Sequence, residues 1–153
     1  MTEPIQVWVA PSARDMTRTY MMEQLALGSK YPRPITAPWN YSVPATRPTG
    51  PFFTIEELNA ADEYGVFAEG QLIQIRGYST DMKWLTSTMR LIKALWKVMP
   101  AWRIAERDEQ TGEPLAVQGV EHAGGPLYDE DPDVPGLYYG QVIAWVTVMT
   151  ELL

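Results

Sequence analysis

The sequence contains no cysteine among its 153 residues. Disulfide bonds and thiolate-ligated metal sites are therefore excluded, which fits a protein that assembles in a reducing cytoplasm. Histidine is almost as scarce, because His122 is the only one. A two-histidine metal site within one chain is excluded, and no G-x-S-x-G nucleophile motif accompanies His122 as part of a catalytic triad. We therefore expect His122 to be an ordinary surface or loop residue.

Long apolar runs are also missing. The longest, such as Val142 to Val148, fall far short of the roughly 20 residues that cross a bilayer as a helix. Glu3 stands where a secretory signal peptide would carry basic residues. The sequence thus predicts an unsecreted protein without a membrane partner. Basic side chains are in the minority, 12 against 19 acidic ones for a net charge of −7, which disfavours nucleic-acid binding by the surface as a whole.

Motifs that would hold a nucleotide or a metal ion are absent too. The pair Gly124-Gly125 lacks the lysine, the hydroxyl residue and the helix of a phosphate-binding loop. Residues Asp129 to Asp133 begin like a calcium loop, but Val134 and Gly140 occupy the positions that need glycine and a bidentate glutamate. Nothing in the sequence sets two carboxylates across a cleft as acid and base. We expect no cofactor, no metal and no catalytic residue, so the protein is predicted not to be an enzyme.

Large aromatic residues and methionine are present in excess. The chain contains six tryptophans, eight tyrosines and eight methionines. These residue types fill hydrophobic cores, and aromatic residues and methionine are also enriched at protein interfaces. The composition therefore leaves two interpretations open, an aromatic core and a self-assembling surface.

The length is that of one domain, so residues 1–153 are predicted to fold as a single domain. Ile5 to Val9 alternates apolar and polar residues and predicts a short extended segment. A helix is predicted from Ser12 to about Leu27, with Asp15 completing a capping pattern at its start. Gly28 then supplies a residue suited to a helix C-terminal cap.

A proline-rich arm or long loop, residues 29–51, follows within this domain. Its prolines remove backbone donors and favour extended backbone. Loops of this length are uncommon inside compact domains and are often functional. Trp39, Tyr41 and Val43 give the segment an apolar content that exposed linkers lack, so it packs either on its own domain or on a neighbour. These three residues are candidates for an inter-subunit arm.

The clearest regular elements lie in the middle of the chain. β-prone residues predict strands at Phe52 to Leu58 and at Gln71 to Tyr78, separated by the polar stretch Asn59 to Gly70. Ser79-Thr80-Asp81 then opens a long helix, which Pro100 ends. The apolar side of that helix follows a helical spacing through Leu85, Met89, Ile92, Trp96 and Met99.

The rest of the chain alternates β-prone segments and turns. Short strands are predicted at Trp102 to Ala105 and at Leu115 to Val120. An acidic loop from Gly124 to Gly136 separates them from a terminal strand, Tyr138 to Leu152. The predicted fold class is α+β, a mostly antiparallel sheet of about four to five strands with two helices packed on it, plus the proline-rich extended arm.

One side of the long helix is almost purely basic. At about 100° per residue, four cationic side chains project within roughly 80° of one another, opposite the apolar stripe. They are Lys83, Arg90, Lys93 and Lys97. In an acidic protein this basic helix face is a candidate surface for DNA phosphates or an acidic partner. The alternative is a solvated helix face whose C-terminal lysines favour the helix dipole.

The order of these elements is itself a pattern. It comprises an early helix, a proline-containing arm, a strand beginning Pro51-Phe52-Phe53-Thr54-Ile55, the alternating strand Leu72 to Tyr78, the turn Ser79-Thr80-Asp81, a long helix and a terminal strand. This order resembles the tail-terminator and tail-completion proteins of long-tailed bacteriophages. The resemblance covers most of the chain from Ser12 to Leu152, and it rests on order and pattern, with no binding residue to carry over.

The resemblance implies a structural virion subunit. Proteins of that family form hexameric rings at the end of a tail tube, where they stop tube growth and provide the docking surface for the head connector. The partners so implied are further copies of the chain, the tail tube protein, the head–tail connector proteins and DNA passing through the ring. The implied location is the tail or neck of the virion, after assembly in the host cytoplasm.

Three alternatives remain open at this point. A head-completion or neck subunit belongs to the same class as a tail terminator. A monomeric α+β ligand-binding domain would use its aromatic residues to line a pocket, and its oligomeric state separates it from a ring subunit. An enzyme of unrecognised type would have to work with carboxylates, tyrosine and lysine alone.

Overall fold

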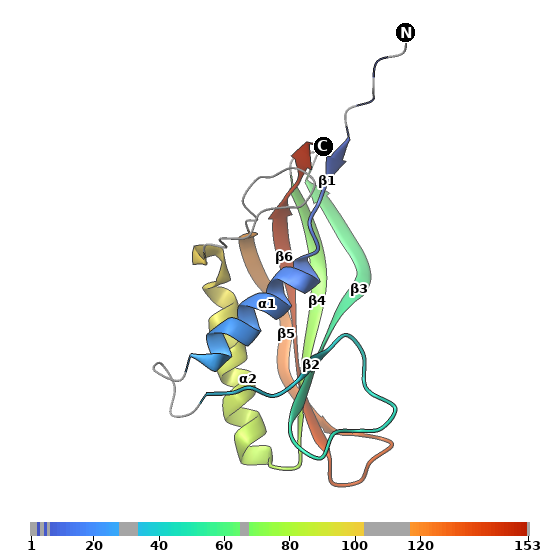
Figure 1. The fold of residues 1–153 in the computed structure, drawn as a ribbon, viewed down its shortest axis with the longest axis vertical. Helices are drawn as coiled ribbons and strands as arrows, with labels where there is room; N and C mark the ends of the chain where they lie inside the picture. Colours follow the sequence, from blue (N-terminus) through green and yellow to red (C-terminus); the bar gives the residue numbers. More distant parts are fainter. Residues whose placement is uncertain are drawn as a thin grey trace.

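A computed structural model describes residues 3, 5, 7–27, 34–64, 68–102 and 117–152 of the chain (Figure 1). Within these ranges the predicted α+β class is confirmed, because two α-helices accompany one five-stranded sheet. In this sheet the two-residue strand Trp39–Asn40 pairs in parallel with Phe52–Tyr64, and the other neighbouring strands are antiparallel. The strands in order across the sheet are β2 (Trp39–Asn40), β3 (Phe52–Tyr64), β4 (Ala68–Ser79), β6 (Tyr138–Met149) and β5 (Val117–Glu130).

Both helices lie on the same face of this sheet (Figure 1). Among the described residues, no helix is long and apolar enough to span a membrane. A separate pair of two-residue strands joins the two ends of the described chain in antiparallel fashion. These remaining elements are α1 (Ala13–Ala26), α2 (Met82–Lys97), the short 3-10 helix η1 (Met99–Ala101), β1 (Trp8–Val9) and β7 (Glu151–Leu152).

The two predicted helix starts are confirmed by their capping bonds. The backbone N–H of Asp15 donates to Ser12 Oγ at 3.2 Å. Asp81 Oδ1 accepts from the backbone N–H groups of Lys83 and Trp84 at 3.0 and 3.2 Å. These bonds satisfy donors that a helix N-terminus otherwise leaves free. The predicted C-terminal cap at Gly28 lies outside the described residues.

The main core lies between the two helices and the sheet, and Met89 of α2 packs directly against the sheet within it. Gly77 of β4 and Gly140 of β6 are directly opposite each other in the ladder. A Cβ on Gly77 would lie 2.8 Å from Met89 Sδ, and one on Gly140 would lie 2.6 Å from Met89 Cγ. The two glycines therefore leave a hollow in the sheet surface that the Met89 side chain fills.

A second, smaller cluster lies on the opposite face of the sheet. The Phe52 and Tyr78 rings stack there at 4.5 Å, and Leu137 is buried with them. Ile35 packs against the main core, whereas Val43 packs against this second cluster. The described part of the arm, residues 34–51, therefore passes from the helix-covered face to the other face around the start of β3.

Two predicted loops are wrong in part. The stretch predicted as a polar connection between the two strands is largely strand: residues 59–64 extend β3, and residues 68–70 extend β4. Backbone pairing, such as that of Tyr64 with Ala68, needs no apolar side chain. Residues 124–130, predicted as an acidic loop, belong to β5. That strand lies at the edge of the sheet, and its register shifts at Gly124 accommodate the glycines and the proline.

The other β predictions differ in their boundaries. The strand predicted from Leu115 is described from Val117 onward, as the start of β5. The terminal strand is divided into β6 and β7. Of the strand predicted at residues 102–105, only Trp102 is described, and it caps η1.

Candidate assembly surfaces

The basic helix face of α2 lies on the flank of the molecule formed by β5. Lys93 Nζ donates to the Gly125 carbonyl of β5 at 3.0 Å. Tyr128 Oη, also on β5, donates to the Thr86 carbonyl at 3.4 Å. Because these contacts come from the side of α2 that carries the cations, the four predicted basic residues share the β5 flank.

Three of the four basic residues remain available to a partner. Lys83, Arg90 and Lys97 are exposed, whereas Lys93 is half-buried and held by β5. The ion pairs formed within the described residues involve other cations, Arg14 and Arg47. A row of three uncompensated positive charges thus runs along α2.

The three residues predicted as an inter-subunit arm have different surroundings. Trp39 is 4% exposed and stacks on Phe53 at 4.5 Å between ring centroids. Its carbonyl accepts from Arg18 Nε and Nη2 at 3.2 and 3.1 Å. The structure therefore places Trp39 in the core of its own subunit. Val43 packs on the second cluster, and Tyr41 remains 44% exposed.

Tyr41 is the one member of this trio that presents much of its surface. The Arg14 guanidinium lies 4.3 Å from its ring centroid, a cation–π geometry. Burial and the neighbouring Asp15 carboxylate raise the pKa of Tyr41 above its ordinary value. The phenol is therefore neutral at physiological pH and acts as an amphipathic surface group.

An ion-pair cluster fixes the far end of the arm. Arg47 Nε lies 3.3 Å from Asp131 Oδ2, and Arg47 Nη2 lies 3.2 Å from Asp133 Oδ2. Asp131 is 4% exposed and also accepts from the backbone N–H of Asp133 at 2.8 Å. A buried carboxylate needs such partners. The arm is thereby tied to the turn that precedes β6.

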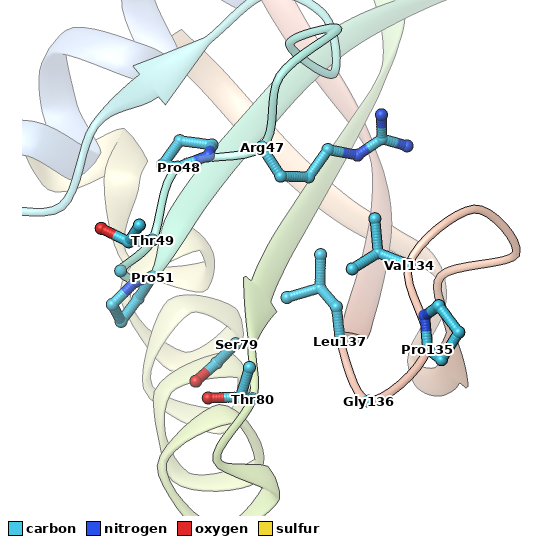
Figure 2. Close-up of a pocket in the computed structure, with 11 residues that line it drawn as sticks. Arg47, Pro48, Thr49, Pro51, Ser79, Thr80, Val134, Pro135, Gly136 and Leu137 are labelled. Atoms are coloured by element: carbon cyan, nitrogen blue, oxygen red, sulfur yellow. The ribbon is translucent and has the colours of Figure 1, made fainter.

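A groove of about 400 Å³ lies beside this ion-pair cluster (Figure 2). Figure 2 shows Arg47 reaching from the arm toward the turn that carries Val134. Arg47 is the one charged residue in the lining, and its guanidinium is already bound by two carboxylates. The remaining lining comes from prolines, glycines, small hydroxyl residues, Val134 and Leu137. The groove therefore offers shape and apolar contact, but no acid–base pair.

The face of the sheet that the helices leave uncovered carries apolar side chains. Along β6, Ile143 and Trp145 are half-buried and alternate with fully buried core residues. Leu72 of β4 is half-buried directly opposite Trp145, and Leu127 of β5 is 64% exposed. We call these four residues the open face. None of them belongs to either cluster formed by the described residues.

His122 sits under α2. Its Nε2 lies 3.3 Å from the Lys93 carbonyl, and its ring meets Trp96 edge-on at 5.7 Å between centroids. Burial lowers the pKa of His122 below its ordinary value. No nucleophile lies within hydrogen-bonding distance of it in the part of the chain that the structure describes, and those residues also contain no group of three potential metal ligands.

The sequence analysis missed two features, the Arg47–Asp131 ion pair and the open face. The Arg47–Asp131 pair joins residues 84 positions apart, and the acidic context of Asp131 resembled an ordinary solvated loop. The open face was hidden because the terminal strand is apolar at nearly every position. An alternation of larger with smaller side chains, Ile143 and Trp145 around Ala144, was the available hint.

Comparisons with known proteins add no relative. No protein-family model matches the chain, and no curated protein matches it either.

Proposed function

We propose that this protein is a structural virion subunit that assembles as a ring at the end of a phage tail tube. In that role it ends tube growth and forms the docking surface for the head connector. The observation that carries the proposal is the open face, where Leu127 is 64% exposed beside the half-buried Leu72, Ile143 and Trp145. Contiguous exposed apolar surface on a folded domain marks a contact with another molecule.

The surroundings of the candidate chemical groups support the same class of function. Within the described residues, His122 contacts a backbone carbonyl and an aromatic ring, and the groove holds no unpaired charge. The apolar open face and the cations of α2 are instead the exposed features that suit contacts with other proteins. The order of elements that resembles tail terminators agrees with this.

The proposal places the protein in the tail or neck of a virion, after assembly in the host cytoplasm. Its partners are further copies of the chain, most simply six, the tail tube protein and the head–tail connector. DNA passing through the ring would lie within reach of any cations that line the channel.

The first test is the solution mass of the purified protein by light scattering, followed by negative-stain imaging and a tube-capping assay. Rings, or capped tubes of uniform length, are the expected result. Leu127→Glu is expected to abolish capping while the subunit stays folded. Met22→Glu is the matched control, because Met22 is 41% exposed on α1, on the face of the sheet opposite the open face. A monomer that leaves tubes uncapped contradicts the proposal.

A head-completion or neck subunit is the closest alternative, and binding to purified connectors in preference to tubes would favour it. A monomeric ligand-binding domain is the second. Its supporting observation is the groove beside Arg47. A stable monomer whose melting temperature rises with a small molecule, and falls back when Leu137 is enlarged to Trp, would move the assignment to that class.

A further inference from the structure

A chain that carries a net charge of −7 meets electrostatic repulsion when it assembles with its own copies. Like-charged surfaces approach only where local charges are complementary. Most described cations are already engaged within the subunit: Arg18 binds the Trp39 carbonyl, Arg47 binds Asp131, and Arg76 donates to Gln141 Oε1. The exposed exceptions cluster on α2, which makes that helix the natural place for a contact between copies.

The exposed cations of α2 form a straight row. Lys83, Arg90 and Lys97 are spaced by seven residues, which is about 10 Å along a helix axis with a drift of only about 20° per step. The Lys93–Gly125 bond fixes the row on the β5 flank. We call these three residues the cationic row.

The opposite flank of the sheet is acidic. In strand order, β5 ends one side of the sheet, while β3 ends the other wherever the two-residue strand β2 does not cover it. Beyond Thr54, β3 is paired only with β4 among the described residues. Its sequence carries four carboxylates and no basic residue: Glu56, Glu57, Asp62 and Glu63.

Two of these carboxylates are described in full. Glu57 is exposed and Glu56 is half-buried. Neither has an ion-pair partner within the described ranges. Glu57 lies opposite Ile73 on the helix-covered face and Glu56 opposite Gln74 on the other, so the β3 edge is acidic on both faces. Among the described residues, this acidic edge and the cationic row on the other flank form two surfaces of opposite sign that have no ion-pair partner within the subunit.

We infer that neighbouring copies associate head to tail, with the cationic row of one copy against the acidic edge of β3 in the next. The inference rests on the proposed ring function and names the contact that builds the ring. A contact between two different surfaces repeats from copy to copy, and it closes into a ring when the rotation allows. Opposite charges across the contact also fix the register and disfavour wrong pairings.

The contact runs through side chains and does not extend the sheet from one copy into the next. The β5 edge shifts register at three places. Pro126 has no backbone N–H to offer, and Lys93 already binds the Gly125 carbonyl. Such irregularities prevent pairing of another strand on an edge. On this flank, the exposed cations of α2 remain for a neighbour to bind.

Charge reversal tests the inference with three full-length proteins: Lys83→Glu with Arg90→Glu, Glu56→Lys with Glu57→Lys, and the chain with all four changes. Sedimentation velocity across a concentration series at low salt measures self-association. Each two-site variant loses two attractions and gains two repulsions, each worth a few-fold, so its association is expected to weaken by about tenfold or more. High salt should weaken the wild type similarly.

Recovery of assembly is the decisive readout. The four-site variant restores opposite charges within one chain, and an equimolar mixture of the two reversed proteins restores them between alternating chains. Both are expected to associate as the wild type does. The glutamate reversal moves the net charge toward zero, so general repulsion alone predicts stronger association, whereas the inferred contact predicts weaker association. Circular dichroism of each variant verifies folding.

The outcomes separate this inference from the proposed function. If the reversed proteins associate as the wild type does, or the wild type fails to self-associate at any concentration, the inferred contact is overturned. Tube capping by the wild-type protein tests the proposed function independently. Recovery of assembly in a protein that caps no tube would support the contact and reject the tail-terminator role.

Discussion

The two faces of the five-stranded sheet have opposite characters. On the helix-covered face, Met89, Ile92 and Trp96 are completely buried against strand residues such as Ile75 and Val142, which are also 0% exposed. On the other face, the described residues form one apolar cluster, at the Phe52–Tyr78 end, where Leu137 and Val43 of the arm pack. The rest of that face carries half-buried apolar residues such as Trp145 beside polar ones such as Gln74 and Arg76, and neither described helix packs on it. The comparison shows that one face holds the subunit together, while the other is the face that our proposal assigns to a partner.

The largest effect is expected from Phe53→Ala on the helix-covered face. Phe53 is fully buried and stacks on Trp39, so the change removes core contacts and also loosens the arm. The free energy of unfolding should fall by about 3–5 kcal/mol. Urea denaturation measures it, with Phe53→Leu as the milder control. If Phe53→Ala lowers the free energy of unfolding no more than Leu127→Ala on the open face does, the two faces do not differ in the way described.

The hollow that seats Met89 gives the next effect. Gly140→Ala places a Cβ 2.6 Å from Met89 Cγ and 2.9 Å from the Tyr128 ring, so the core must shift at a cost of about 1–3 kcal/mol. Gly119→Ala is the control, because nothing lies within 4 Å of its added Cβ. Thermal unfolding should show a drop for the first variant only. In a Met89→Ala background, Gly140→Ala should lower the melting temperature less than it does in the wild type, because the Met89 side chain that it meets is gone.

Adjacent residues of β6 compare the two faces within one strand. Val142 is fully buried on the helix-covered side, whereas Ile143 is half-buried on the open face. Val142→Ala should cost about 2 kcal/mol of stability through lost burial. Ile143→Thr should cost less than about 1 kcal/mol yet impair tube capping. Equal losses of stability from the two variants would indicate that the open face is covered within the subunit.

The smallest effect concerns pH. Burial lowers the pKa of His122 from its ordinary value of 6.5, so the unfolded chain binds the proton more readily than the folded one. The stability linked to this residue is complete above the unfolded pKa and is lost as the pH falls toward the folded pKa. Cations Lys93 and Lys97 oppose protonation as well. Urea titrations between about pH 7.5 and pH 5 should show a shallower decline for His122→Gln.

The sequence predicted the parts of the fold that local patterns control. The Asp81 cap and the spacing of Leu85, Met89 and Ile92 predicted α2 because a helix records its buried face at a fixed period. The apolar centres of β3 and β4 were predicted in the same way. Their polar ends were missed, because backbone pairing extends a strand without leaving an apolar signature.

The candidate site was less accessible to sequence reasoning. The cationic side of α2 follows from helix geometry, and the structure describes its residues together on the β5 flank. Its acidic counterpart on β3 depends on strand order, which no local pattern fixes. Trp39 looked like an interface residue because aromatic residues suit a core and an interface equally, and only the Phe53 stack distinguishes the two.

The seating of Met89 between Gly77 and Gly140 also has a consequence for accuracy of assembly. The fit of Met89 in this hollow helps to set the angle at which α2 lies on the sheet, and therefore the direction in which the helix presents its cations. In a closed ring of identical copies, a small angular error is repeated at every contact and accumulates until the last copy no longer meets the first. In the proposed ring, a residue larger than glycine at position 77 or 140 would therefore change the direction of every contact that α2 makes with a neighbouring copy.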